Sequence, residues 1–199
     1  MKKLLQLKDF LPFQDSSFQT AAKLQLQYQT ASFCNCKCSF MAAYDGCYNY
    51  HVFISYRWKG IGNTFVGFLH SALKREGLDA YIDGKTLPRG EEMLACLFRI
   101  IRNSKIWILV ISKDYADSKR CLIELAEMVE CYESNCHILL PVFLDVDPKD
   151  VQNQTGIFEA WYEKHKKDKE NDEQTITRWK NALTVVTGIP GYELKEVDG

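Results

Sequence analysis

The stretch "SKIWILVISKDYADSKRCLIELAEMVE", residues 104–130, decides the fold class of this chain. Its first part, residues 105–112, is a continuous apolar run, which is the pattern of a strand buried on both faces of a sheet. The part that follows has apolar residues at the spacing of an amphipathic helix: Leu122, Leu125, Ala126 and Val129. Asp117 or Ser118 precedes that helix as its N-cap. A buried strand that leads directly into a helix is the repeating unit of an α/β sheet.

The same alternation of strand and helix extends outward from this stretch in both directions. Further strands are predicted at residues 50–56, 79–83, 137–147 and 191–194. Helices are predicted at residues 63–77, 90–104 and 174–188, and the first of them ends on a glycine, Gly77. Continuous apolar strands favour a parallel sheet, and right-handed crossovers make that sheet doubly wound.

The chain has 199 residues, a formal net charge of −1 and 46% hydrophobic residues, which suits one domain plus a tail. Residues 1–48 are rich in Gln, Ser and Thr and are predicted to be a poorly ordered N-terminal extension, which places the domain at residues 49–199. The near-neutral charge provides no bulk basic field, so a nucleic-acid partner is not expected. No apolar run approaches the roughly 18 residues of a membrane span, so no membrane partner is expected either.

Eight cysteines raise the question of metal binding. Three of them, Cys34, Cys36 and Cys38, form "CNCKC", but this is not the common spacing of a zinc site and no His pair follows, so no metal is expected. The start of the chain does not have the pattern of a signal peptide. The cysteines are therefore interpreted as reduced thiols, and a cytoplasmic location is expected, with the nucleus as a further option.

In a doubly wound sheet, ligands bind beyond the carboxyl ends of the strands, near the topological switch. Those ends are predicted at residues 55–57, 83–89 and 112–115. Arg57 can contact a phosphate bidentately or simply be solvated, and Tyr115 can stack on a base or plug the loop. Neither a G-x-G-x-x-G motif nor a Walker loop is present, so a phosphate-cradling loop is not expected.

Two acidic residues, Glu124 and Glu127, lie on the predicted helix away from its apolar face. Glu124 shares its flank with Cys121 and Met128, whereas Glu127 points to the other flank with Ile123. Periodicity alone leaves open whether either acid is solvated or belongs to a site. Cys121 is interpreted as a packing residue rather than a nucleophile.

Five blocks of sequence resemble one family: "YHVFISYR", "IDGKTLPRGEE", "SKIWILVISKDYADSKRCLIELAEMVE", "ILLPVFLDVDPKDVQNQTG" and "RWKNAL". In this order, over residues 49–194, they are similar to a plant-type Toll/interleukin-1 receptor (TIR) domain. The chain resembles a TIR-only protein, with the monocot kind as one option. The resemblance implies an α/β, flavodoxin-like, doubly wound sheet of five parallel strands with flanking helices.

The resemblance also implies an NAD⁺ or NADP⁺ glycohydrolase of plant immune signalling, activated when TIR domains self-associate into a homo-oligomer. The implied products are nicotinamide with ADP-ribose, variant cyclic ADP-ribose or phosphoribosylated adenosine nucleotides, which lipase-like immune heterodimers sense before cell death. ATP and ADP-ribose are further substrates to consider, and no cofactor is implied because NAD⁺ is itself the substrate. The family's catalytic glutamate lies in a Cys-x-x-Glu-Leu block, which reads "CLIEL" here, so the role falls to Glu124 and Glu127 is the fallback.

Cleavage of the nicotinamide–ribose bond requires little more than one acidic residue. The leaving nicotinamide is cationic and becomes neutral, so no general acid is needed, and one carboxylate near the sugar can stabilise the oxocarbenium-like charge. The loop with Arg89 and Gly90 matches the family segment that shapes the pocket and the self-association surface. The substrate-binding candidates are Ser55, Tyr56, Arg57, Trp58, Arg89, Gly90, Ser112, Tyr115, Arg120 and Cys121.

Three places depart from the family pattern. The glycine after the first strand is Trp58, within "RWKGIGN", and the Ser-His pair of one self-association surface reads Gly67-Phe68. The tryptophan before the Cys-x-x-Glu block is Arg120, whose guanidinium would have to stack on adenine instead. Glu124 favours the glycohydrolase, whereas the altered loop favours the alternative, a non-catalytic TIR adaptor that acts by homotypic TIR–TIR binding. A receiver-like nucleotide binder is disfavoured because no acidic cluster ends the first strand.

Overall fold

The computed structural model describes residues 50–59, 61–82, 91–132 and 137–195. Its strands are β1 (Val52–Tyr56), β2 (Ala80–Ile82), β3 (Ile106–Ile111), β4 (Ile138–Leu144) and β5 (Tyr192–Leu194). Its helices are α3 (Ile61–Arg75), α4 (Glu91–Asn103), α5 (Lys119–Tyr132), α6 (Pro148–Asn153), α7 (Ile157–Lys167) and α8 (Glu173–Thr187).

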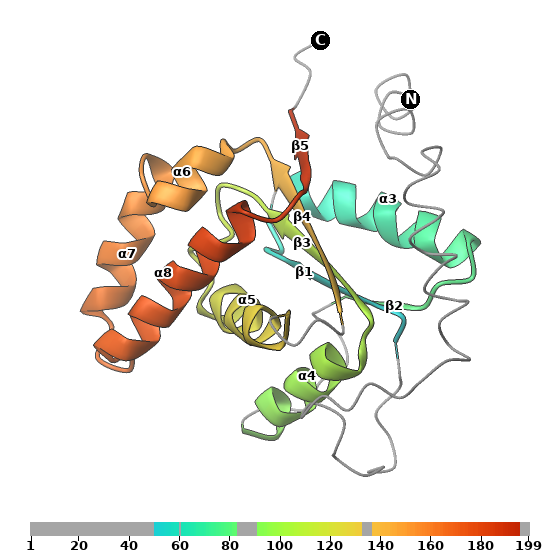
Figure 1. Ribbon diagram of the computed structural model, residues 1–199, viewed down its shortest axis with the longest axis horizontal. Helices are drawn as coiled ribbons and strands as arrows, with labels where there is room; N and C mark the ends of the chain where they lie inside the picture. Colours follow the sequence, from blue (N-terminus) through green and yellow to red (C-terminus); the bar gives the residue numbers. More distant parts are fainter. Residues whose placement is uncertain (1–49, 60, 83–90, 133–136, 196–199) are drawn as a thin grey trace. The chain divides into compact units, whose positions relative to one another are not determined.

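The five strands form one sheet in the order β2-β1-β3-β4-β5, and every neighbouring pair is parallel. The chain first moves from β1 to β2 on one side, then crosses to β3 on the other side of β1. Helix α3 lies on one side of the sheet and helices α4 and α5 lie on the other (Figure 1). The predicted α/β, flavodoxin-like, doubly wound sheet of five parallel strands is confirmed, and its topological switch lies between β1 and β3.

The two central strands supply much of the core. Every residue of β1 and of β3 is buried, as their continuous apolar sequences predict. Burial of one such Ile, Leu, Val or Phe side chain contributes about 1.5–3 kcal/mol. A rigid sheet therefore holds the carboxyl ends of β1 and β3 in fixed positions.

Helix α3 ends where its glycine predicts. Gly77 has a φ of 75°, a left-handed conformation that favours glycine, and its N–H donates to the carbonyl of Lys74 at 3.1 Å. The N–H of Leu78 donates back to the carbonyl of Leu73 at 3.0 Å. These bonds close the helix and turn the chain into β2.

Two helices between β4 and α8 are not anticipated by the sequence analysis. Asp147 caps α6 by accepting the N–H of Lys149 at 2.8 Å, and Pro148 occupies the first turn. Helix α7 buries Phe158, Trp161 and His165, which are spaced three and four residues apart along one face. Both signals were present in the sequence, and α7 matters because it reaches the loop after β3.

Several predictions concern residues that the structure does not describe. The N-terminal extension (residues 1–48), the "CNCKC" cysteines and the loop with Arg89 and Gly90 all lie outside the described residues. In the part that is described, no helix combines the length and apolar character that a membrane crossing needs. No group of three or more His, Cys, Asp or Glu side chains suited to a metal ion occurs within these same ranges.

Candidate active site

Helix α5 begins at Lys119 with Ser118 as its N-cap, which decides between the two predicted N-caps. The Ser118 hydroxyl accepts the N–H of Cys121 at 3.3 Å, and its carbonyl accepts the N–H of Leu122 at 3.1 Å. Because the start of α5 is fixed in this way, Glu124 faces β1, which contacts this helix.

Glu124 is buried, with only 1% of its surface exposed, and Glu127 is 4% exposed. The prediction that both acids lie away from the buried side of the helix is therefore wrong. Helix α5 contacts β1, β4, α4 and α8, so it is enclosed on almost every side rather than along one apolar stripe. A buried carboxylate is costly unless it is hydrogen-bonded, so the partners of each acid decide what it does.

The Glu124 carboxylate is held from inside the sheet. The Ser55 hydroxyl on β1 donates to Glu124 Oε2 at 2.6 Å and lies 2.9 Å from the Tyr115 hydroxyl. The Tyr115 hydroxyl in turn donates to the carbonyl of Cys121 at 3.0 Å. These bonds join β1, the loop after β3 and the first turn of α5, and they fix one orientation of the carboxylate.

Tyr115 is fully buried, which favours the role of plugging the loop over that of stacking on a base. Burial raises the pKa of the Tyr115 hydroxyl well above its usual value, and electrostatic interactions with Cys121 and Glu124 act in the same direction. The hydroxyl therefore stays protonated and remains a donor. Ser55 is likewise 0% exposed and contacts Glu124 rather than the surface.

The second oxygen of Glu124 is covered by Arg120. The guanidinium Nε of Arg120 donates to Glu124 Oε1 at 3.3 Å, four residues away on the same helix. The side chain of Arg120 is 29% exposed, compared with 1% for Glu124. Arg120 therefore lies between the carboxylate and the solvent.

A group of cations surrounds one carboxylate near the same strand end. Asp117 forms an ion pair with Lys164 of α7, and its Oδ2 lies 3.9 Å from Arg57 Nη2. The hydrogen bond from Lys164 lowers the pKa of Asp117, and the charges of Lys59 and Arg57 act in the same direction. The Nε of Arg57 is buried without a hydrogen-bond partner among the described residues. Lys164 was missed by the sequence analysis because no helix was predicted at α7, and Lys59 was not singled out although it lies in the quoted segment after β1.

The other candidates lie around this edge of the sheet in different environments. The Cys121 thiol is buried and donates to the carbonyl of Tyr56 at 3.4 Å, which agrees with its predicted packing role. The ring of Trp58 is 55% exposed and lies 5.9 Å from the ring of Tyr56. Ser112 is nearly buried, and its carbonyl accepts the N–H of Tyr115 at 2.9 Å.

Glu127 belongs to a different cluster on the far flank of α5. Arg102 of α4 donates from Nε to Glu127 Oε1 at 2.6 Å, and Arg178 of α8 lies 3.9 Å from Oε2. The Cys131 thiol also donates to Glu127 Oε1, at 3.7 Å. Because its partners come from neighbouring helices, Glu127 ties α4, α5 and α8 together and is placed poorly for the fallback catalytic role.

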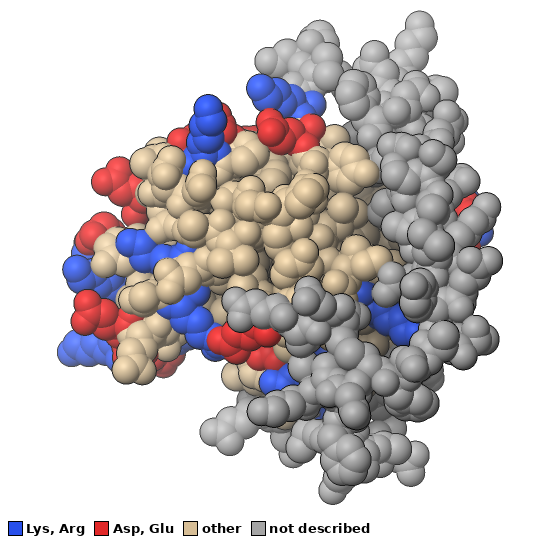
Figure 2. Space-filling view, viewed as in Figure 1, with Lys and Arg blue, Asp and Glu red and all other residues tan. Residues whose placement is uncertain are grey.

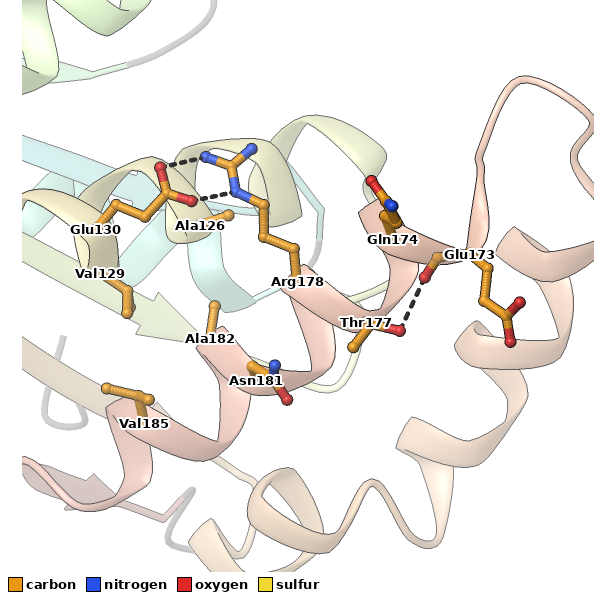
Figure 3. Close-up of a pocket in the computed structure, with 10 residues that line it drawn as sticks. All are labelled: Ala126, Val129, Glu130, Glu173, Gln174, Thr177, Arg178, Asn181, Ala182 and Val185. Carbon is orange, nitrogen blue, oxygen red and sulfur yellow. Dashed lines mark hydrogen bonds and ion pairs between the residues drawn. The ribbon is translucent and has the colours of Figure 1, made fainter.

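A cleft of about 660 Å³ opens between α5 and α8 (Figure 3). Arg178 and Glu130 face each other across it in a bidentate ion pair with distances of 2.5 and 2.8 Å. Glu124 is not among the residues that line it, which are Ala126, Val129, Glu130, Glu173, Gln174, Thr177, Arg178, Asn181, Ala182 and Val185. This cleft is therefore separate from the Ser55–Glu124 cluster, although both use α5.

Charges of both signs mix over the surface near α7 and α8. On the face drawn in Figure 2, blue and red side chains alternate along this side of the domain. The ion pair Arg178–Glu130 and the 3.1 Å pair Lys119–Glu170 are examples. The local group of Arg57, Lys59 and Lys164 is accordingly more relevant to an anionic ligand than the overall charge.

A family model described as "TIR domain" matches residues 49–199 of this chain. The chain is 37% identical over 147 residues to the disease resistance protein RPS6 of Arabidopsis thaliana, a match that covers 74% of this chain and 13% of that protein. It is also 37% identical over 148 residues to the disease resistance protein RPV1 of Vitis rotundifolia, covering 73% of this chain and 10% of that protein. The matched region is thus a small part of both relatives.

One solved structure is similar in both fold and sequence. It is a chain from the structure of the activated Roq1 resistosome directly recognizing the pathogen effector XopQ (TIR domains). The TM-score is 0.66 and the sequence identity is 38%, over 73% of this chain and 87% of that chain. The matched fold agrees with the five-stranded parallel sheet described above.

Proposed function

Because this chain belongs to the TIR domain family, as the match over residues 49–199 shows, we propose that it is an NAD⁺ or NADP⁺ glycohydrolase of plant immune signalling. The observation that carries the proposal is the buried carboxylate of Glu124, which Ser55 holds at the carboxyl end of β1 beside the topological switch. The similarity to plant disease resistance proteins supports the immune setting. The reaction is placed in the cytoplasm or nucleus, as the reduced cysteines suggest.

The proposed reaction breaks the bond between C1′ of the ribose and N1 of nicotinamide. The electron pair of that bond moves to N1, so the nicotinamide leaves as a neutral molecule. Water adds to C1′ and releases a proton to the solvent, which gives ADP-ribose. If a nitrogen or hydroxyl of the same molecule's adenosine replaces water, the product is a cyclic ADP-ribose, and if a hydroxyl of ATP or ADP-ribose replaces water, the product is an ADP-ribosylated nucleotide. Hydrolysis of the diphosphate bond in that product by a second water would leave a phosphoribosylated nucleotide, and lipase-like immune heterodimers would sense these products.

In this mechanism Glu124 is the catalytic residue and Ser55 is a positioning residue. Glu124 accepts hydrogen bonds from the ribose hydroxyls and places negative charge beside C1′ as that atom becomes cationic. Ser55 holds Oε2 at 2.6 Å, so the sugar reaches Oε1 once Arg120, which donates to that oxygen at 3.3 Å, moves away. The protonated Tyr115 supports Ser55 at 2.9 Å and keeps water away from that side.

The alternative is a non-catalytic adaptor that binds other TIR domains. It is favoured by the exposed Trp58 in the altered loop, since a large exposed aromatic side chain is common at protein interfaces. It is also favoured by the arginine that covers Glu124 Oε1. An adaptor would self-associate without consuming NAD⁺, whereas in the proposed enzyme self-association activates the reaction.

The test is to incubate the full chain at high concentration with NAD⁺ and with NADP⁺ and to separate the nucleotides by chromatography. We expect release of nicotinamide, and we expect Glu124→Ala to abolish it. Analytical ultracentrifugation of the same samples reports self-association. Oligomers that leave NAD⁺ intact would support the adaptor, and turnover that survives in Glu124→Ala would remove Glu124 from the mechanism.

A further inference from the structure

We propose that Arg120 keeps Glu124 in a closed ion pair that only a phosphate-bearing substrate opens, so that Arg120 sets which nicotinamide ribosides this chain cleaves. The inference rests on the proposed function and adds a substrate requirement to it. It concerns Arg120, which the sequence analysis identified as a departure from the family pattern.

The first step is that both oxygens of the Glu124 carboxylate are occupied. Ser55 donates to Oε2 at 2.6 Å and Arg120 donates to Oε1 at 3.3 Å. A ribose hydroxyl needs one of these oxygens as its acceptor. Because Glu124 is 1% exposed and Arg120 lies on its solvent side, a donor has to move before the sugar can reach the carboxylate.

The second step is that the two donors differ in their freedom to move. Ser55 is 0% exposed, lies within the central strand β1 and also contacts the Tyr115 hydroxyl. Arg120 lies in the first turn of α5 with 29% of its side chain exposed. Its bond to Oε1 is also longer than the Ser55 bond by 0.7 Å (3.3 − 2.6). Rotation of the arginine side chain opens the pair without disturbing the sheet, so Arg120 is the donor that leaves.

The third step concerns charge. A guanidinium against Oε1 offsets the negative charge that Glu124 has to supply to the developing oxocarbenium. While the Arg120–Glu124 ion pair is formed, Glu124 can neither bind the sugar nor supply its full negative charge. Opening the ion pair makes the carboxylate available as a hydrogen-bond acceptor and restores its charge.

The fourth step is to ask which part of a substrate can draw Arg120 away. The diphosphate of a dinucleotide is an anion that the guanidinium fork binds bidentately. At the same edge of the sheet, Arg57, Lys59 and Lys164 surround the single carboxylate of Asp117, which leaves an excess of positive charge to attract that anion. Nicotinamide riboside has the same C1′–N1 bond but no phosphate, so it offers the guanidinium of Arg120 no anion to bind in place of Glu124.

The experiment measures kcat/KM for NAD⁺ and for nicotinamide riboside with the full chain, Arg120→Gln and Arg120→Lys. In the wild type we expect NAD⁺ to be favoured by at least about 100-fold, because only its diphosphate binds Arg120 and the neighbouring basic side chains. Arg120→Gln should raise kcat/KM for nicotinamide riboside by about twofold, since the weak ion pair no longer has to open, and lower it for NAD⁺ by about tenfold. Arg120→Lys, which keeps the charge, should retain most of the preference. Arg178→Gln is the matched control, since Arg178 pairs with Glu130 away from this edge, and it should leave the ratio unchanged.

Equal losses for both substrates in Arg120→Gln, or no change in either, would overturn the proposal. Calorimetric titration with ADP-ribose and with nicotinamide riboside separates this failure from failure of the proposed function. If the wild type releases no nicotinamide, the proposed glycohydrolase function is refuted. The affinities of wild type and variant for the two ligands then decide whether Arg120 acts as proposed. We expect Arg120→Gln to bind ADP-ribose about tenfold more weakly and nicotinamide riboside more tightly, and equal binding by wild type and variant would refute the ion-pair gate.

Discussion

Helix α5 carries two buried glutamates, Glu124 and Glu127, whose side chains lie in two different regions of the molecule. Comparing these regions shows that burial alone does not distinguish a candidate catalytic acid from a structural one. Glu124 and Glu127 are three residues apart and 1% and 4% exposed, and each accepts a hydrogen bond from an arginine Nε. The partners of Glu124 come from β1 and from its own helix. The partners of Glu127 come from α4 and α8 and, through the Cys131 thiol, from its own helix, but none comes from the sheet.

The origin of the partners separates a candidate catalytic acid from a structural one. The arginines of Glu127, Arg102 and Arg178, join three helices that pack together. Ser55 instead sets the orientation of Glu124 at the carboxyl ends of the parallel strands, where ligands bind in this class of sheet. Four measurements test this comparison, beginning with the largest expected effect.

The largest effect is expected from changing each acid to its neutral isostere. Glu124→Gln keeps a hydrogen-bonding group for Ser55 but removes the charge, so nicotinamide release from NAD⁺ should fall by about 100- to 1000-fold. Glu127→Gln should change the rate of nicotinamide release by less than about twofold at temperatures below the melting temperature of the variant. The buried charge of Glu127 joins helices and therefore affects the stability of the fold rather than the cleavage step. Loss of activity in Glu127→Gln with an intact fold would exchange the two roles.

The second effect is on stability, measured by double-mutant cycles in urea. The Arg102–Glu127 pair has a 2.6 Å hydrogen bond to a buried acid, and its coupling free energy should be about 1–2 kcal/mol after allowing for the 42% exposure of Arg102. The Arg120–Glu124 pair, at 3.3 Å, should show about 0.5 kcal/mol or less. A stronger coupling for Arg120–Glu124 would contradict an ion pair that a substrate opens.

The third effect concerns Tyr115. Tyr115→Phe leaves the Cys121 carbonyl without its buried donor and removes the hydroxyl that lies 2.9 Å from Ser55, which should lower the free energy of unfolding by about 1–2 kcal/mol. The raised pKa of Tyr115 also predicts a loss of stability as the pH rises above the usual value of 10.0, because the unfolded chain then releases a proton that the folded chain retains. This contribution of Tyr115 to the pH dependence of the unfolding free energy, up to about 1.4 kcal/mol per pH unit, should vanish in Tyr115→Phe. Tyr162→Phe on α7 is the control, and an unchanged alkaline slope in Tyr115→Phe would refute the assignment.

The smallest effect is expected in mild acid. Burial lowers the pKa of His165 from 6.5, outweighing its bond to the Ala116 carbonyl, and Lys164 lowers it further while Asp117 and Asp168 act in the opposite direction. As the pH falls below 6.5 the unfolded chain binds a proton that the folded chain does not, so stability should fall by about 1 kcal/mol. Thermal melts of the wild type and His165→Gln between pH 7 and pH 5 measure this, and identical pH dependence in the two proteins would exclude His165.

Part of the candidate site could be predicted from sequence. The "CLIEL" block picked out Glu124 through the family resemblance, and the strand ends placed Ser55, Arg57 and Tyr115 in one region. The Arg120–Glu124 pair follows helical i,i+4 spacing and was open to prediction. The Ser55–Glu124 bond was not, because its two residues are 69 positions apart and no local pattern joins them.

The sequence by itself determined the strands and the turn at Gly77, and it narrowed the N-cap of α5 to Asp117 or Ser118, since apolar runs, caps and left-handed glycines act through near neighbours. It also contained the cap of α6 and the apolar face of α7, although these helices were overlooked. Only the tertiary structure decided that Glu124 and Glu127 are both buried and have different partners. Periodicity describes one helix with one buried side, whereas α5 is surrounded by β1, β4, α4 and α8, and that enclosure arises from contacts between segments distant in the chain.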